Sequence, residues 1–280
     1  MIRILKKGLH TSIQDLGRIG FRNYGLPVSG AMNSDDAKLS NVILGNNETD
    51  AVMEITLQGP KLQFLHKTQI AITGANLSPT LNGSAIEMNK SVAIEKGSIV
   101  SFGARINGVR SYLSVNGGFQ TEQIFGSRSY YQGITLKEKI ENEDELSFPL
   151  RIIKNQYHVH VQYQAQDYEQ KELLVFKGPE FELLNEAQQK QVLTSNFTLG
   201  INNRMAYQLK ELIANELTPI ISSAVLPGTV QLTPSGKMLI LMRDCQTTGG
   251  YPRIFQLSEQ AINCLSQKMQ HETIQFKLIT

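Results

Sequence analysis

The sequence lacks any run of about 18 apolar residues, the length that a membrane-spanning helix needs. It also shows no long apolar stretch near residue 1 that ends in a small-residue cleavage site, so no signal peptide is predicted. Neither sign of charge dominates, because 27 basic and 25 acidic residues leave a net charge of +2. A chain so nearly neutral offers no electrostatic attraction to nucleic acid or to an anionic membrane. We therefore predict no partner of either kind.

Cysteine is scarce, with Cys245 and Cys264 the only two in 280 residues. Their spacing matches no metal-ligand pattern, and so few cysteines favour a reducing compartment, here predicted to be the cytoplasm. Cys245 lies in a polar loop and is a candidate nucleophile. The alternative, a small buried apolar side chain, is the commoner state of a free cysteine and is favoured here.

Several sequence motifs that are typical of particular enzyme activities are absent. The sequence contains no phosphate loop, no dinucleotide-binding glycine pattern and no nucleophile elbow. His158 and His160 alternate on one face of a predicted strand, but no third ligand is evident. We favour exposed strand residues over metal ligands for this pair, and we predict no metal site.

The residues that are present favour a β-rich fold. The chain is 41% hydrophobic, which is enough for a core. Short apolar runs separated by glycine, proline and asparagine recur along it, as in barrels and sandwiches. Helices are predicted at residues 34–44, 186–193 and 258–269 from caps and apolar spacing. The fold class predicted is mainly β with a few short helices.

The strands form two series that resemble each other. Residues 57–65 match residues 176–184 around a Gly-Pro pair, and residues 97–102 match residues 228–233. Each series then has an apolar strand followed by Gly-Gly-aromatic, at 117–119 and at 249–251. We predict two barrel-like halves related by an internal repeat, residues 1–150 and 151–280, with an approximate boundary and allowance for a chain crossover. A single long β domain is the alternative.

Polar, glycine-rich segments concentrate the reactive side chains. They are residues 10–32, 116–129, 202–205 and 243–254. An arginine fork in such a loop suits carboxylate or phosphate, and a nearby carboxylate suits a metal ion or a base role. Each arginine taken alone is more simply explained by a structural ion pair. Their common placement in loops between strands favours an ordered functional site.

These segments carry a family resemblance. Residues 11–20, 25–32, 41–46, 54–56, 73–76, 126–129, 203–205 and 246–252 resemble the biotin-dependent carboxyltransferase family. That family includes the 5-oxoprolinase C subunit (PxpC), KipA and one half of the urea carboxylase carboxyltransferase domain. The likeness runs through nearly the whole chain and preserves the order of the motifs.

The resemblance implies a fold and an activity. The fold is two cyclophilin-like β-barrels. The activity is that of one subunit of an ATP-dependent cyclic amide hydrolase, active only in complex, which opens 5-oxo-L-proline to L-glutamate with a PxpB (KipI-like) and a PxpA subunit. ATP with Mg²⁺ is the cofactor implied, and biotin is not expected on this chain. Two alternatives stay open: a KipA-like regulator that binds a KipI-like kinase inhibitor, and the carboxyltransferase half of a urea carboxylase-type enzyme.

The site residues follow from the resemblance and the polar segments. The catalytic candidates are Asp15, Arg18, Arg128, Arg204 and Asp244, and the substrate-binding candidates are Gln14, Ser29, Gln246, Thr247, Thr248, Gly249 and Gly250. The expected roles are arginines on phosphate or carboxylate, aspartates on metal or water, and Gln and Thr on the lactam. Asn33 and Asn203 stand where the family often has aspartate, so a carboxylate role at these two positions is in doubt.

Overall fold

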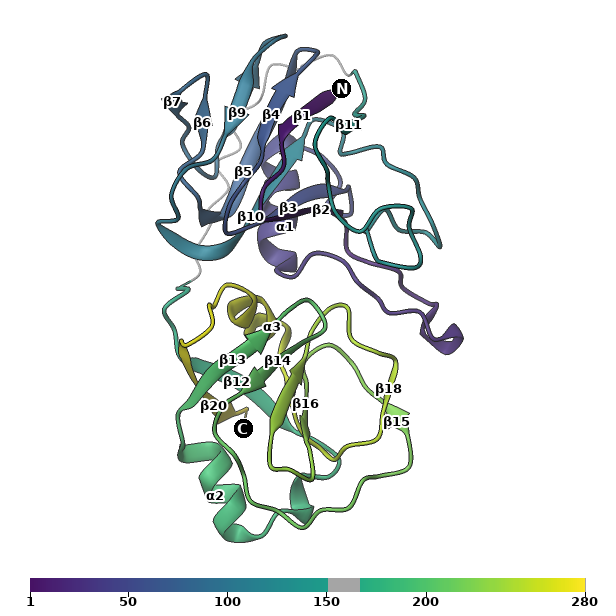
Figure 1. Cartoon of the computed structure of the whole chain (residues 1–280), viewed down its shortest axis with the longest axis vertical. Coiled ribbons are helices and arrows are strands. Elements are labelled where there is room, and N and C mark those ends of the chain that lie inside the picture. Colours follow the sequence, from purple (N-terminus) through teal and green to yellow (C-terminus); the bar gives the residue numbers. More distant parts are fainter. Residues whose placement is uncertain (151–166, 280) are drawn as a thin grey trace. The chain divides into compact units, whose positions relative to one another are not determined.

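The computed structural model describes residues 1–150 and 167–279. The chain divides into two compact units (Figure 1). Unit 1 contains Met1–Arg18 and Ser29–Gln166, and unit 2 contains Ile19–Val28 and Asp167–Thr280. The short segment Ile19–Val28 therefore leaves its sequence neighbours and groups with the C-terminal unit. The predicted domain boundary near residue 150 remains a prediction.

Unit 1 is built from two antiparallel sheets that enclose an apolar core. The six-stranded sheet has the order β11 (Glu145–Leu146), β1 (Ile2–Lys6), β4 (Lys61–Phe64), β9 (Ile99–Ser101), β6 (Thr80–Leu81) and β7 (Ser84–Ala85). The five-stranded sheet has the order β2 (His10–Gln14), β3 (Val52–Thr56), β10 (Asn107–Val115), β5 (Thr68–Asn76) and β8 (Ser91–Ile94). Strand β1 shows the expected alternation, because Ile2 and Ile4 are buried while Arg3 reaches toward solvent.

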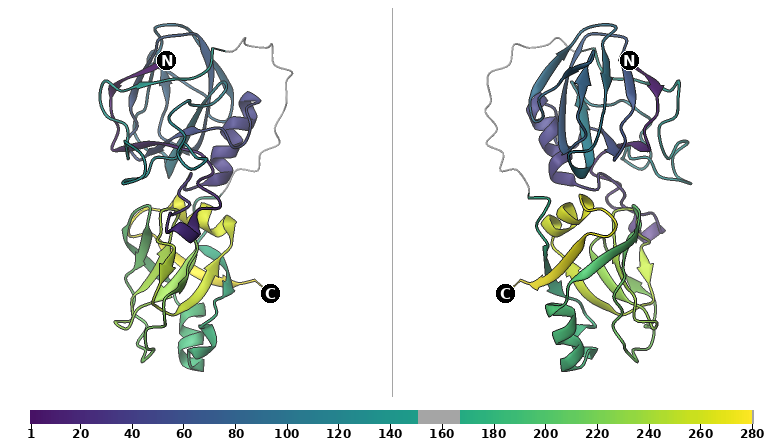
Figure 2. Two further views of the ribbon diagram at one scale, coloured as in Figure 1. Left: turned by 90° about the vertical axis from the view of Figure 1, so that its right-hand side faces the viewer. Right: turned by 60° about the vertical axis from the view of Figure 1, so that its left-hand side comes forward.

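Helix α1 (Ser34–Leu44) packs on β5 and β10 of the five-stranded sheet (Figure 2). It begins at the predicted cap, where the side chain of Asn33 accepts hydrogen bonds from the amides of Asp35 and Asp36. It ends at Gly45, whose φ of 67° is the left-handed conformation that glycine tolerates. The helix predicted from the sequence at residues 34–44 is confirmed.

Unit 2 is a closed β-barrel. Its strands, in order around the barrel, are β12 (Glu172–Lys177), β19 (Arg253–Leu257), β16 (Thr229–Leu232), β17 (Met238–Leu241), β14 (Ala206–Leu209), β13 (Phe197–Asn202) and β20 (Thr273–Leu278). Phe255 fills the interior between Phe181 and Phe276, at ring-centroid distances of 5.3 and 5.1 Å. Aromatic pairs at this spacing stabilise a core beyond their buried area.

Short elements complete unit 2. They are the 3-10 helices η1 (Arg22–Tyr24) and η2 (Phe181–Leu183), helices α2 (Glu186–Thr194) and α3 (Glu259–Ser266), and the two-stranded sheet of β15 (Ser223–Ala224) and β18 (Thr248–Gly249). Helix α3 packs on β12 and β19, and α2 packs on β20. The prediction of a mainly β chain with a few short helices is confirmed.

The landmarks of the predicted internal repeat correspond in part. Residues 97–102 and 228–233 match, because Gly97 and Gly228 have φ values of 87° and 89° and the strands β9 and β16 follow them. The other two landmarks differ. Residues 61–64 form strand β4, whereas Phe181–Leu183, their proposed counterpart, is a 3-10 helix. The glycine pairs differ as well. Gly117 and Gly118 have φ values of 85° and 72° in a turn, whereas Gly249 lies in strand β18. Local sequence similarity therefore identified equivalent local structure at residues 97–102 and 228–233 but not at the Gly-Pro and Gly-Gly-aromatic landmarks.

The sequence predicted an ordered loop over residues 10–32, but part of this segment is a strand. Residues His10–Gln14 form β2, which pairs with β3 in register from His10 opposite Thr56 to Gln14 opposite Val52. Its polar side chains concealed the strand, because Thr11, Ser12 and Gln14 are buried together with Ile13. The predicted strand with His158 and His160 lies outside the described residues. None of the helices among the residues described has the length and hydropathy to cross a bilayer.

Replacing Asn33 with alanine tests the helix cap. Asn33→Ala removes the acceptor for two main-chain amides at 3.1 Å, whereas Asn33→Ser keeps a capping oxygen. We expect Asn33→Ala to unfold at lower urea than Asn33→Ser, by about 1 kcal/mol in the free energy of unfolding. Both variants lose the amide bond to Asp36, so their difference isolates the cap. Equal stability, measured by circular dichroism, would contradict the cap's role.

Candidate functional site

The predicted site residues fall into two groups, one in each unit. Unit 1 holds Gln14, Asp15, Arg18, Ser29 and Arg128. Unit 2 holds Arg204, Asp244, Gln246, Thr247, Thr248, Gly249 and Gly250. Each group is described by itself.

Asp15 is the centre of the group in unit 1. It follows β2 directly, and its carboxylate accepts four hydrogen bonds: from the amides of Gly17 and Arg128, at 2.8 and 2.6 Å, and from the hydroxyls of Ser127 and Ser129, at 2.6 and 2.7 Å. The side chain is buried. A buried carboxylate needs hydrogen-bond donors, and these four supply them. Its geometry makes Asp15 the residue that fixes the segment 127–129 beside the end of β2.

The other polar side chains of this group bind main-chain carbonyls. Arg18 is fully buried and donates from Nη2 to the carbonyl of Ser129. Arg128 donates from Nη1 to the carbonyl of Thr121 and from Nη2 to Gln120 Oε1, the latter at 3.0 Å. Gln14 donates to Ser12 Oγ at 2.9 Å and to the carbonyl of Tyr130 at 3.3 Å. These contacts order the loops, since buried main-chain groups need partners.

Ser29 stands at a strained position in the same group. Its φ is 58°, a left-handed conformation that costs a serine about 1 to 3 kcal/mol. The next residue, Gly30, lies so close to the backbone of Gly17 that a Cβ would approach its nitrogen to 2.9 Å. Ser29 Oγ is buried, and no hydrogen bond reaches it from the part of the chain that the structure describes. A strained, buried hydroxyl without a partner suits a ligand-binding position.

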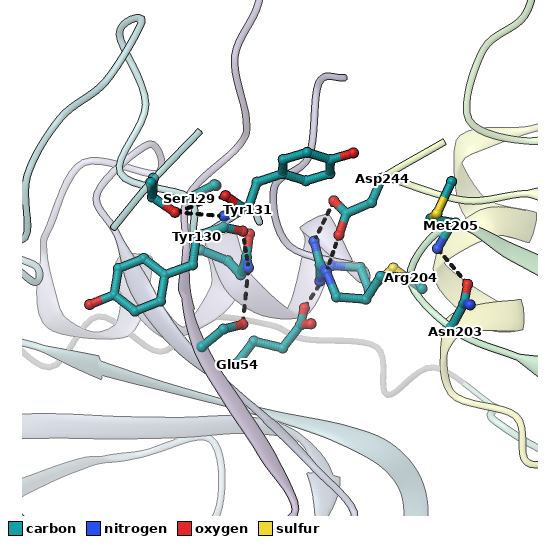
Figure 3. Close-up of polar contacts among 12 residues, drawn as sticks. Glu54, Ser129, Tyr130, Tyr131, Asn203, Arg204, Met205 and Asp244 are labelled. Carbon is teal, nitrogen blue, oxygen red and sulfur yellow. Dashed lines mark hydrogen bonds and ion pairs between the residues drawn. The ribbon is translucent and has the colours of Figure 1, made fainter. Parts of the chain in front are cut away.

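Arg204 and Asp244 form an ion pair in unit 2 (Figure 3). Arg204 Nε and Nη2 donate to the two carboxylate oxygens of Asp244 at 2.7 and 3.1 Å, a fork-to-fork geometry. The main chain supports this pair, because the amide of Asp244 donates to the carbonyl of Arg204 at 2.9 Å. Asn203 closes the turn by accepting from the amides of Met205 and Ala206. Asn203 thus acts as a turn-forming residue here, a role that needs no carboxylate.

The segment 246–250 follows this ion pair. Gln246 and Thr248 are exposed, so their polar groups are available to a ligand. Gly249 is in β18 and lies close to Gln231, since a Cβ there would meet Gln231 Nε2 at 2.5 Å. A side chain at this position would displace the end of the Gln231 side chain. The segment between β17 and β18 is a short turn in which Met242, Asp244 and Cys245 are buried and Gln246 is exposed.

Cys245 does not have the properties of a nucleophile. Its side chain is buried in a small apolar cluster with Val225 and Leu241. Burial raises the pKa of the Cys245 thiol to about 11, against a smaller opposing effect of Arg22. Little thiolate exists near neutral pH under these conditions. The structure supports the apolar interpretation of this cysteine.

The sequence interpretation missed a buried polar cluster in unit 1. Glu54, in β3, accepts hydrogen bonds from the hydroxyl of Tyr112 at 2.9 Å and from the amide of Met32 at 2.7 Å, and Arg110 lies 3.8 Å from its other oxygen. Burial and then the charge of Glu54 raise the pKa of Tyr112 well above its usual value. One signal was present in the sequence: a glutamate inside the otherwise apolar run Val52–Thr56. A buried charge in a strand is rare and points to a structural or functional role.

Neither group assembles a metal-binding cage. No set of three or more His, Cys, Asp or Glu side chains converges anywhere in residues 1–150 and 167–279. The chemistry available is hydrogen bonding, arginine charge and the carboxylates of Asp15, Glu54 and Asp244. Such groups bind and polarise a carboxylate, an amide or a phosphate.

Comparison with known proteins places this geometry in a family. The family model "Carboxyltransferase domain, subdomain A and B" matches residues 24–278. The 5-oxoprolinase C subunit of Escherichia coli is 31% identical, with 95% of this chain and 87% of that protein covered. The C subunit of the Haemophilus influenzae 5-oxoprolinase is 28% identical, with 100% and 92% covered. The crystal structure of Kluyveromyces lactis urea carboxylase superposes with a TM-score of 0.85 at 26% identity, covering 100% of this chain but only 27% of that one.

The Asp15 network makes a prediction for stability. Asp15→Asn replaces one acceptor oxygen by an amide NH2 group, which cannot accept from the donors that face it. Unit 1 therefore loses buried hydrogen bonds. We expect the free energy of unfolding to fall by about 2 to 3 kcal/mol in urea titrations followed by circular dichroism. Asp35→Asn, at an exposed aspartate, is the matched control, with an expected change of about 0.5 kcal/mol or less. Equal effects of the two substitutions would show that the network contributes nothing special.

Proposed function

This chain belongs to the carboxyltransferase domain family, and we propose that it is the C-type subunit of a 5-oxoprolinase. In the proposed reaction, the chain acts with PxpB (KipI-like) and PxpA subunits in the ATP-dependent hydrolysis of 5-oxo-L-proline to L-glutamate. The proposal rests on one observation, the large share of both chains that aligns when this chain is compared with the C-type relatives. Nearly all of this chain aligns with nearly all of each relative, so the likeness is to a whole protein of that name.

The reaction requires activation of a lactam. Hydrolysis breaks the C–N bond of the ring and adds water, which leaves a carboxylate and an amine. Transfer of the terminal phosphoryl group of ATP to the amide oxygen, with release of ADP, would activate the carbonyl carbon toward attack by water. The ring C–N bond then breaks with the nitrogen leaving as the amine, and hydrolysis of the resulting acyl phosphate releases phosphate and the carboxylate. Negative charge then develops on the phosphoryl and carbonyl oxygens, and cationic donors fixed in advance stabilise it most effectively.

Arg204 is the residue that we assign to this charge. Its guanidinium is held by Asp244 through two hydrogen bonds, so its orientation is fixed before a ligand arrives. The exposed side chains of Gln246 and Thr248 are assigned to the polar edge of the lactam. The carbonyl of Thr247 accepts a hydrogen bond from the amide of Val225 at 3.1 Å, so this residue helps to hold the loop in place.

ATP and Mg²⁺ are assigned to the complex and not to a particular loop of this chain. The sequence has no phosphate loop, and the described residues gather no carboxylate cage. Mg²⁺ commonly needs only one or two carboxylates because phosphate oxygens and water complete its shell. When bound, the metal would neutralise phosphate charge during transfer. A cytoplasmic location goes with this proposal, since both cysteines are buried and unpaired.

Carboxyl transfer is the second candidate. The observation in its favour is the whole-chain superposition on Kluyveromyces lactis urea carboxylase. In that case the biotin would have to be carried by another protein, as the sequence here shows no biotinylation segment. The two candidates differ in their substrates, so an assay separates them.

The deciding experiment is reconstitution. We expect the chain co-expressed with A- and B-type subunits to release glutamate from 5-oxoproline only when ATP is present and when this chain is included. Arg204→Ala and Asp244→Ala should each lower kcat/KM by about a hundredfold or more, because a fixed charge donor is lost. Arg243→Ala is the matched control. It removes an ion pair with Glu259 next to the same turn and should change kcat/KM by no more than about twofold.

Other results have defined meanings. Carboxylation with a biotinylated carrier, without glutamate release, would favour the second candidate. Tight binding of a B-type partner with no turnover in any assay would favour a KipA-like regulator. Full activity of Arg204→Ala would remove that residue from the proposed site.

A further inference from the structure

We propose that Arg22 is the positioning residue of the substrate loop, residues 246–250. Arg22 lies on η1, in the segment Ile19–Val28 that leaves the N-terminal part of the sequence and joins unit 2. The inference rests on the proposed function only for the statement that this loop binds the lactam. The structural part of it concerns what holds the loop in place.

Arg22 bridges the two main-chain segments that form the base of the loop. Its Nη2 donates to the carbonyl of Val225 and, at 3.2 Å, to the carbonyl of Thr247. The amide of Val225 also donates to the carbonyl of Thr247 at 3.1 Å. One guanidinium thus ties the segment that precedes the barrel strand β16 to the first residues after Cys245.

The loop needs this support because its own strand pairing is minimal. The β15–β18 sheet consists of two strands with the register Ser223 opposite Gly249 and Ala224 opposite Thr248. A two-stranded ribbon of this length is marginal by itself. Hydrogen bonds from a charged donor are about twice as strong as neutral ones, so Arg22 adds substantially to the few bonds present.

Arginine is suited to this position for a geometric reason. A planar guanidinium presents several donors in fixed directions and can bond to two carbonyls together. A lysine ammonium is a compact charge on a flexible stem, and it holds such a pair less rigidly. Arg22→Lys should therefore retain part of the anchoring, and Arg22→Ala should retain none.

Cys245 provides a direct reporter of the anchoring. It directly precedes the loop, its side chain has no exposed surface, and it packs against Val225. Any local opening that separates residue 225 from residue 247 would expose the thiol. Arg22 is close enough to act electrostatically on that thiol. Alkylation of Cys245 in the native protein therefore measures how often the base of the loop opens.

The first test is thiol labelling in a Cys264→Ser background, which leaves Cys245 as the only cysteine. We expect iodoacetamide to modify Cys245 about tenfold faster in Arg22→Ala than in the parent, with Arg22→Lys between them. Lys268→Met is the matched control. Lys268 is a buried cation of unit 2 that, like Arg22, donates to a main-chain carbonyl, that of Tyr168 at 3.1 Å, and its loss should leave Cys245 protected.

The second test separates positioning from general stability. In the reconstituted complex, Arg22→Ala should raise KM for 5-oxoproline by about fivefold or more and change kcat by no more than about twofold. Urea unfolding gives the change in the global free energy of unfolding of Arg22→Ala. The increase in the Cys245 labelling rate should be larger than this change accounts for. Labelling no faster than in Lys268→Met, or labelling that only parallels global unfolding, would overturn the proposal.

The two layers of inference fail in different ways. If the wild-type complex does not turn over 5-oxoproline, the proposed function fails, while the labelling rates still decide whether Arg22 anchors the loop. If turnover occurs and Arg22→Ala changes neither labelling nor KM, the positioning role fails alone. Should Arg22→Ala not fold, the Arg22→Lys variant supplies the same comparison.

Discussion

The loops of this protein depend on buried or half-buried charged side chains that bind the main chain. Asp15 accepts four hydrogen bonds around the end of β2, and Arg18 and Arg22 donate to carbonyls of segments far away in the sequence. Irregular backbone cannot be buried unless its amides and carbonyls find partners. Each charge is therefore fixed by the loop that it orders. Removing one leaves several polar groups unpaired, so the effect of a substitution spreads beyond a single contact.

This constraint changes the meaning of the candidate residues. Asp15 and Arg128 belong to the expected catalytic set, yet their observed contacts position neighbouring backbone. The Arg204–Asp244 pair differs, because here a carboxylate binds an arginine side chain through two hydrogen bonds. Gln246 and Thr248 keep exposed polar groups on a turn that the barrel holds. The proposed chemistry rests on these latter groups of unit 2, whereas Asp15 and Arg128 order the loops of unit 1.

The resemblance and the composition were enough to predict a mainly β chain of this family, and the comparisons confirm both. Helix α1 was predictable to its ends, since its cap Asn33 and its stop Gly45 act through neighbours in sequence. The predicted equivalence of the glycine pairs was wrong, because Gly117 and Gly118 have positive φ in a turn whereas Gly249 lies in strand β18. The polar strand β2 was missed because alternation fails when hydroxyl and amide groups are buried.

The family, the β character and the segments where polar groups concentrate could all be read from the amino-acid sequence. These properties follow from local propensity and from ordered motifs, which a single chain displays directly. Only the folded structure shows which charged side chains contact which partners. Arg22 contacts residues 225 and 247, and Glu54 meets Tyr112, because strand pairing and the crossing segment Ile19–Val28 bring them together. Such long-range partners leave no local pattern in the sequence, so the contact of Arg22 with residues 225 and 247 could be found only in three dimensions.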